Sequence, residues 1–346
     1  MENSGAFGPQ EQKHLRQAAA ISVVVGSALM ILKFWAYNMT DSTAIYSDAM
    51  ESIVNVVAAL MALFVIWYSI KPMDEDHPYG HGKSEFFSSA FEGGLIAFAS
   101  LMIIFEAVQA WRLGNTLHRL SDGTWLVLVA GLANLALGLF LKRRGKKLNS
   151  IALSASGAHV ITDFWTSATL VVSLLLVQWT DWAWLDPVCA LFYGGWLAWT
   201  GFQLVRESIG GLMDREDPAV LQSLAKVFTD SMQPGIIQIH HVRVIRSGWF
   251  HHIDAHVVMP EFWDVFKVHS VIQKFEKDAI SNYQYDGEMN FHVDPCRRVY
   301  CQVCELKNCP IRQEEFQSPM PVKLEDIRSP VEPARFRRTK RHSGAK

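Results

Sequence analysis

The sequence predicts a membrane α-helical bundle of six transmembrane helices followed by a cytoplasmic α+β domain. Three observations lead to this fold class. Half of the 346 residues are hydrophobic. Only 19% are charged, whereas soluble proteins average about 25%. The mean hydropathy of +0.10 is close to neutral, which indicates a chain that is part bilayer-embedded and part water-soluble. A purely soluble enzyme and a secreted mini-domain are therefore excluded.

Six apolar segments precede residue 210, and each is near the roughly 20 residues that cross a bilayer. The first is too long for the core of a signal peptide, and no small-residue cleavage site follows it, so we interpret it as a span. We expect the six spans at 17–37, 43–70, 85–111, 123–142, 150–178 and 182–206.

Lysine and arginine in the short loops predict the orientation of these spans. The loop after the second span contains Lys71 and Lys83, and the loop after the fourth contains the basic run 142–147. The first and fifth loops contain none, and the third, with Arg112 and Arg119, departs mildly from the pattern. We therefore expect a multi-pass protein of the cell (inner) membrane with both termini in the cytoplasm.

The composition changes after Leu212, where helical and strand patterns follow one another in the order α-β-β-α-β. This order predicts a small sheet with helices on one face. The helices are expected at 218–232 and 265–281, and the strands at 242–245, 253–259 and 288–293. The resulting parts of the chain are a cytoplasmic N-terminal segment (1–16), the transmembrane domain (17–210), the cytoplasmic α+β domain (211–295), a cysteine cluster (296–309) and a basic tail expected to be disordered (310–346).

Ionisable side chains inside the predicted spans are costly, and each therefore marks a candidate functional site. The second span contains Asp48, Glu51 and Asn55, and the fifth contains His159 and Asp163. Glu51 and Asn55 are four residues apart, as are His159 and Asp163, so each pair lies on one helix face. Two such faces turned toward each other would place four donors around one divalent metal ion.

The alternative is a hydrogen-bonded pair that only holds the two helices together. We favour the metal site because buried carboxylates need a counter-charge, and neither span contains lysine or arginine. Glu51 and Asp163 together balance a divalent cation when the histidine is neutral. A low dielectric favours the protonated carboxyl groups once the metal leaves, so exchange of metal for protons follows from the electrostatics of the site.

Two further groups of residues have metal-ligand chemistry. Asp74, His77 and His81 lie within eight residues of the loop after the second span. They form a credible second metal site, although a polar cytoplasmic loop would also contain such residues. More than half of the chain's 13 histidines lie between residues 240 and 292, which solubility alone does not require.

Five motifs, in this order, resemble those of the cation diffusion facilitator family: Ser47-Asp48-Ala49 leading into Glu51-x-x-x-Asn55, His77-Pro-Tyr-Gly-His81-Gly-Lys83-x-Glu85, His159-x-x-x-Asp163, Asp186-Pro187 and His292-Val-Asp294-Pro295. The resemblance runs from about residue 15 to residue 295. It implies a homodimeric, proton-coupled exporter of divalent transition metals rather than an enzyme. It also implies six membrane helices and a cytoplasmic domain with a ferredoxin-like, metallochaperone-like fold. The net charge of −2 gives no reason to expect a nucleic-acid partner.

The resemblance assigns three sets of metal ligands by position. The transport site would comprise Glu51, Asn55, His159 and Asp163, with Asp48 as a substitute for Asn55. The loop site would comprise Asp74, His77 and His81. The cytoplasmic ligands, which the family places in a binuclear cluster near the dimer interface, would be His240, His256, His269, His292 and Asp294. Three further histidines, His241, His251 and His252, have no family counterpart and are expected at the surface.

The second span departs from the pattern of zinc transporters in this family. Those proteins usually have His or Asp at position 51 and Asp at position 55, where this chain has Glu51 and Asn55. The resulting site of one nitrogen and three oxygens suits zinc, which we favour, and also suits iron(II), manganese or cobalt. Cadmium is a further candidate substrate.

Four cysteines, Cys296, Cys301, Cys304 and Cys309, follow the last family motif. A set with this spacing can close a structural zinc site or, as the less favoured option, hold an iron–sulfur cluster. The alternatives are reduced, solvated thiols or transient disulfides, which a cytoplasmic location disfavours. The family resemblance does not extend to this cluster. Cys189 is interpreted as a small packing residue of the sixth span.

The sequence supports a secondary transporter that exchanges metal for protons by alternating access. A membrane-anchored metal sensor that binds without transporting is the second hypothesis, motivated by Asn55 and the cysteine cluster. A membrane metalloenzyme would need an activated water and a general base, and the sequence contains no nucleophile motif or cofactor fingerprint.

Overall fold

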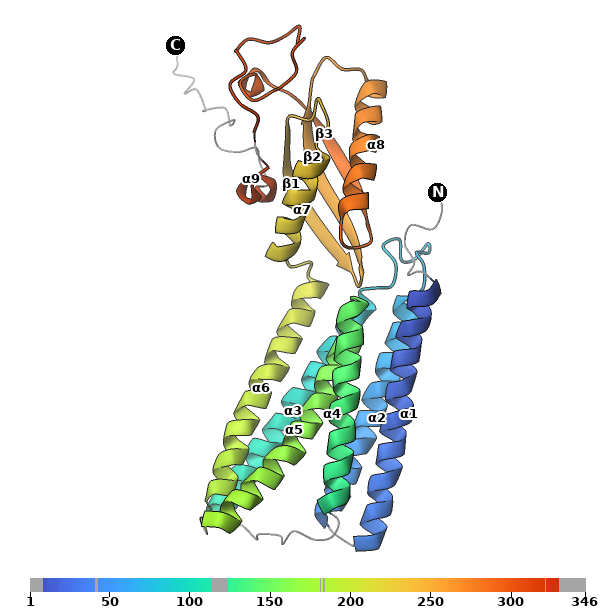
Figure 1. Ribbon diagram of the computed structural model, residues 1–346, viewed down its shortest axis with the longest axis vertical. Coiled ribbons are helices and arrows are strands. Elements are labelled where there is room, and N and C mark those ends of the chain that lie inside the picture. Colours follow the sequence, from blue (N-terminus) through green and yellow to red (C-terminus); the bar gives the residue numbers. More distant parts are fainter. Residues whose placement is uncertain are drawn as a thin grey trace. The chain divides into compact units, whose positions relative to one another are not determined.

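The computed structural model describes residues 9–40, 43–113, 124–180, 182, 184–320 and 322–329. The chain divides into two compact units, one containing Ala6–Met213 and the other Asp214–Lys346. The described part of the first is built from long helices, and the second combines helices with a small sheet (Figure 1). The division falls close to the boundary expected at residues 210 and 211.

Six long helices form the described part of the first unit, and their positions agree with the six apolar segments of the sequence. They are α1 (Pro9–Thr40), α2 (Thr43–Ser69), α3 (Ser84–Leu113), α4 (Thr124–Lys147), α5 (Ile151–Thr180) and α6 (Leu185–Leu212).

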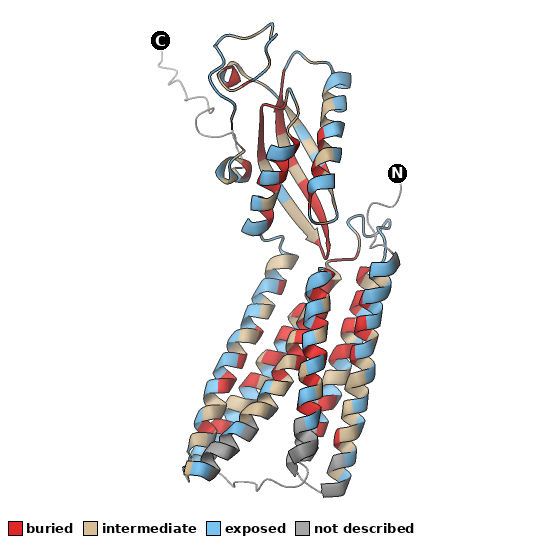
Figure 2. Ribbon diagram, in the orientation of Figure 1, coloured by how far each residue is buried: buried red, intermediate tan, exposed pale blue. Residues whose placement is uncertain are grey.

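Four of these helices contain stretches that are long and apolar enough to cross a membrane, as judged over the described residues. The stretches are Gln10–Trp35, Ser52–Ser69, Ser84–Gln109 and Pro187–Leu212. Large apolar side chains such as Phe98, Leu101 and Phe192 are exposed on this unit, and buried residues lie on the helix sides that face one another (Figure 2). Large apolar side chains exposed in this number fit a lipid environment. Six spanning helices remain a prediction.

Close backbone contacts between glycines hold the bundle together. Gly138 of α4 and Gly157 of α5 face each other, and a Cβ atom on either would lie 2.9 Å from the carbonyl oxygen of the other. Gly93 of α3 and Gly201 of α6 form an equivalent contact. Small residues allow helices in a bilayer to approach closely where van der Waals packing drives their association. The contact between Gly138 and Gly157 brings α4 close to α5, which carries two of the predicted metal ligands.

A buried carboxylate from α3 caps the start of α5. Glu85 accepts hydrogen bonds from the backbone N–H groups of Ile151 (2.6 Å) and Ala152 (3.2 Å), and from the hydroxyl group of Ser150 (3.1 Å). The N–H groups of the first helical turn have no partner within their helix, and a negative charge also complements the helix dipole there. Glu85, which belongs to the second family motif, therefore positions α5.

The second unit confirms the predicted α-β-β-α-β order. Its elements are α7 (Pro218–Ser231), β1 (Gln238–Ser247), β2 (Phe250–Met259), α8 (Val265–Asn282) and β3 (Gly287–Pro295). The strands are ordered β1-β2-β3, with β1 and β2 antiparallel and β2 and β3 parallel. A two-residue turn joins β1 to β2, and Gly248 in this turn has a φ angle of 64°, which glycine adopts without steric cost.

One face of this sheet is covered by α7 and α8 (Figure 1). Alternate residues of β2, including Ile253, Ala255 and Val257, pack with Phe228 of α7 and Phe275 of α8 in a single hydrophobic core. Because successive strand residues point to opposite faces, the residues between them, such as His256, lie on the other face.

The tail expected to be disordered contains a short helix, α9 (Leu324–Arg328). Ile327 on this helix is fully buried in the hydrophobic core, and the carbonyl oxygen of Ser329 accepts a hydrogen bond from the backbone N–H of His241 (3.0 Å). Val322 and Leu324 also pack against this core, so a few apolar residues order this part of the tail, and composition alone did not reveal it. Residues 330–346 lie outside the described part of the chain.

Candidate metal sites

Three of the predicted transport-site side chains meet between α2 and α5. The amide nitrogen of Asn55 donates a hydrogen bond to Oδ2 of Asp163 (2.7 Å), and its Oδ1 lies 3.1 Å from Nε2 of His159. His159 and Asp163 are four residues apart on α5 and therefore share one helix face. The side chain of His159 is only 5% exposed, so this group is enclosed by the helices.

Asp48 and Glu51 also lie on α2. Their side chains are outside the described part of the structure, so their assignment to this site stays a prediction. The backbone places Glu51 one helical turn before Asn55, on the same side of α2.

A second acidic residue of α3 approaches this site, and the sequence analysis missed it. Glu92 is 1% exposed, and it is close enough to His159 and Asp163 of α5 to interact with them electrostatically. The sequence could have identified Glu92, because it is an ionisable residue within a predicted span. The four-residue spacing that drew attention to the pairs on α2 and α5 has no counterpart around Glu92.

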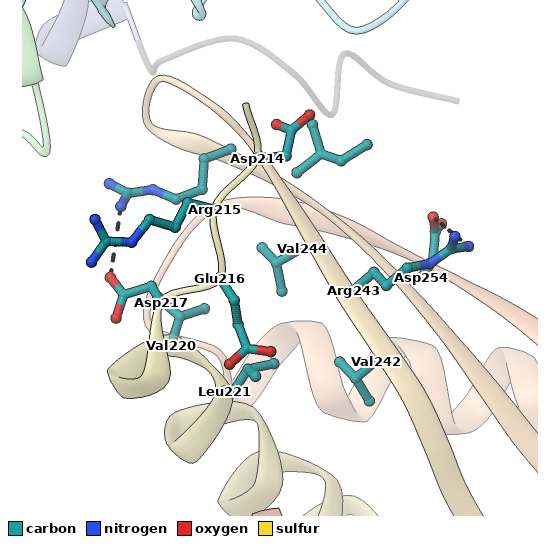
Figure 3. A pocket seen from close by; sticks show the side chains of 12 residues that line it. Asp214, Arg215, Glu216, Asp217, Val220, Leu221, Val242, Arg243, Val244 and Asp254 are labelled. Atoms are coloured by element: carbon teal, nitrogen blue, oxygen red, sulfur yellow. Dashed lines mark ion pairs between the residues drawn. The ribbon is translucent and has the colours of Figure 1, made fainter. Parts of the chain in front are cut away.

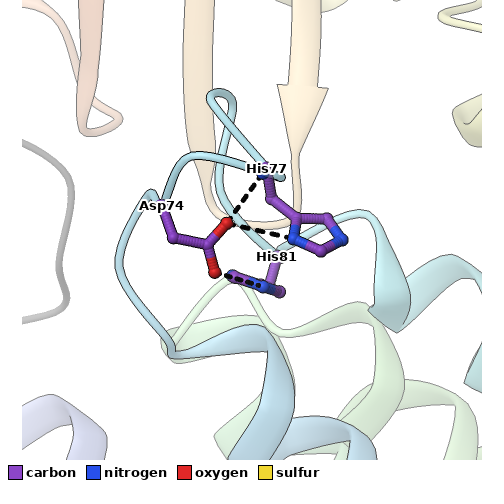
Figure 4. A group of neighbouring side chains, drawn as sticks. All are labelled: Asp74, His77 and His81. Atoms are coloured by element: carbon purple, nitrogen blue, oxygen red, sulfur yellow. Dashed lines mark hydrogen bonds and ion pairs between the residues drawn. The ribbon is translucent and has the colours of Figure 1, made fainter.

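The loop between α2 and α3 brings Asp74, His77 and His81 together (Figure 4), with their ligand atoms within 4.8 Å of one another. Oδ1 of Asp74 lies 3.1 Å from Nδ1 of His77, and Oδ2 lies 3.4 Å from Nε2 of His81. Slight desolvation raises the pKa of Asp74, but hydrogen bonds from His77 and the nearby histidine rings outweigh it and lower the pKa. The result is an ionised carboxylate flanked by two imidazoles.

A row of three histidines crosses the open face of the sheet. His240 of β1 is paired with His256 of β2, which is in turn paired with His292 of β3. Asp294 lies two residues beyond His292 on the same face, with Oδ2 at 3.0 Å from Nδ1 of His256 and 3.6 Å from Nε2 of His240. These three ligand atoms form one group within 4.8 Å, and we call His240, His256, His292 and Asp294 the sheet cluster.

The sheet cluster is buried at one end and open at the other. Burial lowers the pKa of His240 to about 4, against the opposing influence of Asp294, and the neighbouring histidines lower it further. His240 is therefore neutral near pH 7, as a metal ligand must be. The side chain of His292 is 67% exposed, and its Nε2 lies 3.5 Å from Oδ1 of Asp294.

A β-bulge lies beside this cluster. The pairing shifts between His240 and Arg243, and His241 adopts a positive φ of 52°. Bulges of this kind redirect side chains next to functional sites, and the ring of His241 lies 4.9 Å from that of His256.

His269, also predicted as a cytoplasmic ligand, is exposed on α8. Because α8 covers the face of the sheet opposite the sheet cluster, His269 does not join the cluster within one chain.

Two histidines expected at the surface are buried, so that prediction was wrong. His251 is 2% exposed, and its Nδ1 lies 2.7 Å from the hydroxyl group of Tyr283. His252 is 3% exposed, and its Nδ1 lies 2.8 Å from Oε1 of Glu288. Each is an imidazole held by a specific hydrogen-bonding partner.

A separate cavity of about 300 Å³ lies between the start of α7 and the second half of β1. Its charged walls are largely paired. Arg246 lies 3.7 Å from Asp217, and Arg243 lies 3.6 Å from Asp254 (Figure 3). Asp217 also caps α7 through the backbone N–H of Ala219. These contacts give the residues structural roles and leave little unbalanced charge for an ionic ligand.

The structure therefore combines long apolar helices with groups of side chains that could hold a metal ion. Two family models match the chain: "Cation efflux transmembrane domain" over residues 19–213 and "Cation efflux protein, cytoplasmic domain" over residues 218–296. Together they cover most of the sequence, and the chain belongs to the cation efflux family, which confirms the resemblance to the cation diffusion facilitators. It is a multi-pass membrane protein of a family of transporters.

Curated relatives cover nearly the same length. The "Uncharacterized transporter sll1263" of Synechocystis sp. is 37% identical over 81% of this chain and 90% of its own length. The "Cation-efflux pump FieF" of Yersinia pestis is 27% identical over 84% of this chain and 96% of its own. The protein of the same name from Pectobacterium carotovorum is 27% identical over 85% of this chain and 97% of its own.

Proposed function

We propose that this protein is a secondary active exporter of divalent transition-metal ions. In this proposal it exchanges each ion for protons by alternating access and works as a homodimer. The observation that carries the proposal is the meeting of Asn55, His159 and Asp163 between α2 and α5 in a chain of the cation efflux family. Relatives named cation-efflux pumps, similar over almost their whole length, support efflux over sensing.

The hydrogen bonds of the helical site support an exchange mechanism. The side-chain amide of Asn55 is hydrogen-bonded to both Asp163 and His159. A divalent ion between the two helices would take Asp163 Oδ2 and His159 Nε2 as ligands and break both bonds. When the ion leaves, Asp163 either accepts a proton, as a low dielectric favours, or returns to Asn55. The amide of Asn55 therefore stabilises the metal-free state.

The donor types support a range of metals. His159 supplies one nitrogen, and the other ligands proposed here are oxygens from Asp163, Asn55 and Glu51. Zinc accepts such a set and is the favoured substrate, but oxygen-rich sites also suit iron(II), manganese and cobalt, and cadmium stays a candidate. The two carboxylates would balance the charge of one divalent ion.

The sheet cluster and the loop site would bind ions from the cytoplasm. In this proposal both termini lie on the cytoplasmic side of the inner membrane, and the α+β units dimerise. Ion binding at the sheet cluster would favour one arrangement of the two units and so shift the transport equilibrium. The exposed His292 and His269 are where a second copy could supply or receive a ligand.

Metal flux into or out of proteoliposomes under an imposed pH gradient tests the proposal. The purified full-length protein is assayed with zinc, iron(II), manganese, cobalt and cadmium in parallel, next to Asp163→Ala. We expect proton-driven flux of at least one ion, and we expect Asp163→Ala to reduce it to the rate of protein-free vesicles. That result would also identify the transported metal.

Thr200→Ala is the matched control, because Thr200 is a half-buried residue of α6 whose hydroxyl group donates a hydrogen bond within its own helix, to the carbonyl oxygen of Trp196. It should keep the wild-type flux. Wild-type flux from a correctly folded Asp163→Ala protein would contradict the site assignment. Absence of flux for every ion, with metal binding retained, would favour the sensor.

A further inference from the structure

The segment after β3 holds four of the chain's five cysteines and is anchored to the sheet. The backbone N–H of Cys296 donates to the carbonyl oxygen of Met259 at the end of β2 (2.7 Å). The 3-10 turn η1 (Arg298–Tyr300) follows, and the buried ring of Tyr300 packs with Ile237 and Val258. This small hydrophobic cluster lies on the same face of the sheet as the sheet cluster, because Val258 is two residues from His256.

All four cysteines of this segment line one small cavity. It holds about 10 Å³ of solvent space, which is close to the space needed for a single water molecule. Cys301 and Cys304 are buried, Cys296 and Cys309 are partly buried, and all four are free thiols rather than disulfides. The four cysteines that the sequence spacing singled out therefore line the same cavity in the fold.

An arginine holds the turn that carries the two central cysteines. The guanidinium group of Arg312 donates to the carbonyl oxygens of Cys301 (2.7 Å), Cys304 (2.7 Å) and Leu306 (2.8 Å). The backbone N–H of Gln313 points at the sulfur atom of Cys301 (3.5 Å).

Three positively charged side chains belong to the lining of the cavity. Arg297, Arg298 and Arg312 all contribute to its lining, and Arg298 also pairs with Glu261 (2.8 Å). A divalent ion bound by four thiolates carries two net negative charges, which these guanidinium groups would offset. Among the described residues, three ligand atoms of the loop site, and likewise three of the sheet cluster, lie within 4.8 Å of one another, whereas the four sulfur atoms lie farther apart. Zinc–sulfur bonds of about 2.3 Å would draw them closer.

We propose that Cys296, Cys301, Cys304 and Cys309 bind one structural zinc ion. The closed set of four thiolates leaves no open position for chemistry or transport, and the small cavity suits a single ion better than an iron–sulfur cluster. The ion would tie residues 297–312 to the ends of β2 and β3. The family match for the cytoplasmic domain ends at residue 296, so this site is an addition beyond the matched domain. It is independent of the transport proposal.

Cadmium is a suitable probe, because its bonds to thiolate sulfur give an ultraviolet charge-transfer band that histidine and carboxylate ligands do not give. Purified full-length protein, reduced and stripped of metal, is titrated with cadmium. We expect the band to saturate at one cadmium per chain. Cys301→Ser/Cys304→Ser should lose the band, while Cys189→Ser, which removes the remaining cysteine, should keep it in full.

Two further measurements keep the test decisive if the double variant does not fold. Cys309→Ser changes only a partly exposed ligand and should reduce the band while the protein remains folded. His256→Ala, which alters the sheet cluster, should leave it unchanged. Elemental analysis of protein that has not been stripped of metal should find more zinc per chain in the wild type than in Cys301→Ser/Cys304→Ser or in Cys309→Ser.

Three results would overturn the proposal. The first is the absence of a thiolate band in the wild-type protein, and the second is iron with inorganic sulfide bound in place of zinc. The third is the finding that the four cysteines form disulfides in protein isolated with alkylation. Loss of the zinc in a variant that still transports metal would support the structural site without affecting the proposed function.

Discussion

The helical site and the sheet cluster combine the same donor types in different ways. In the helical site, His159 and Asp163 share one face of α5, and Asn55 reaches them from α2. In the sheet cluster, His240, His256 and His292 stand in register on three strands, and Asp294 completes the group. The first arrangement depends on how two helices pack, and the second on backbone pairing within one sheet.

This difference has consequences for access and for rigidity. His159 is 5% exposed, whereas the side chain of His292 is 67% exposed. A site between helices can open and close when the helices move, as alternating access requires. A row across paired strands cannot change without breaking the sheet. The helical site therefore suits transport, and the sheet cluster suits reversible binding from the surrounding solution.

The largest expected effect separates these two roles. Asp163→Ala should lower metal flux in proteoliposomes to background, whereas His256→Ala should retain measurable flux. In His256→Ala, the metal affinity of the sheet cluster should fall by at least about tenfold, since changes around metal ligands commonly reduce affinity by about 10- to 100-fold. Isothermal titration of the full-length protein measures that affinity. Equal loss of flux in both variants would remove the distinction between a transport site and a regulatory site.

A smaller expected effect is the loss of stability at acidic pH. A loss of transport at low pH from this cause could be mistaken for proton coupling at the helical site. Burial lowers the pKa of His251 to about 4, and Arg246 lowers it further, against the opposing influence of Asp217. In the unfolded chain the pKa of this histidine is near 6.5, so the unfolded protein binds more protons than the folded protein between pH 6.5 and pH 4. The contribution of the neutral His251 to the free energy of unfolding is complete above pH 6.5. It falls by on the order of 3 kcal/mol as the pH decreases toward 4.

Hydrogen exchange of β2 amides in chelator-treated protein, corrected for intrinsic exchange rates, measures this loss. His251→Asn should flatten the pH dependence of protection between pH 6.5 and 4, leaving the similar contribution of His240. His269→Asn, which changes an exposed histidine, should leave it as in the wild type. An unchanged slope in His251→Asn would show that the buried imidazole does not control acid stability.

The smallest expected effect sharpens the account of the helical site. Asn55→Asp would place a second carboxylate 2.7 Å from Asp163, where the amide now donates a hydrogen bond. Repulsion would destabilise the metal-free state and the added charge would favour a cation, so zinc affinity should rise by about tenfold, or about 1.4 kcal/mol. Binding titrations of Asn55→Asp and the wild type measure this change. Weaker binding would show that Asn55 is itself the better ligand.

Some features of the site could be predicted because they are local. The four-residue spacing of His159 and Asp163 already places them on one face of a helix, and an intramembrane charge already marks a functional position. The order of elements in the α+β unit follows from hydrophobic periodicity, and the structure confirms it. The alternation of strand residues also explains why His256 and Asp294 share a face once the strands are known to pair in register.

Other features depend on which surfaces are covered. His251 and His252 read as surface residues, yet Tyr283 and Glu288, about 30 residues or more away in sequence, bury and bind them. Glu85 reads as part of a metal-binding motif, yet it caps α5 across 66 positions of sequence.

The sequence by itself determined the helices, the strands and the types of metal ligand, because these follow from periodicity and side-chain chemistry. Only the tertiary structure decided that Asn55 bridges His159 and Asp163, that Glu92 approaches them, and that Ile327 orders part of the tail. Each of these contacts joins residues far apart in the chain, and its energy depends on packing and burial that no local pattern encodes.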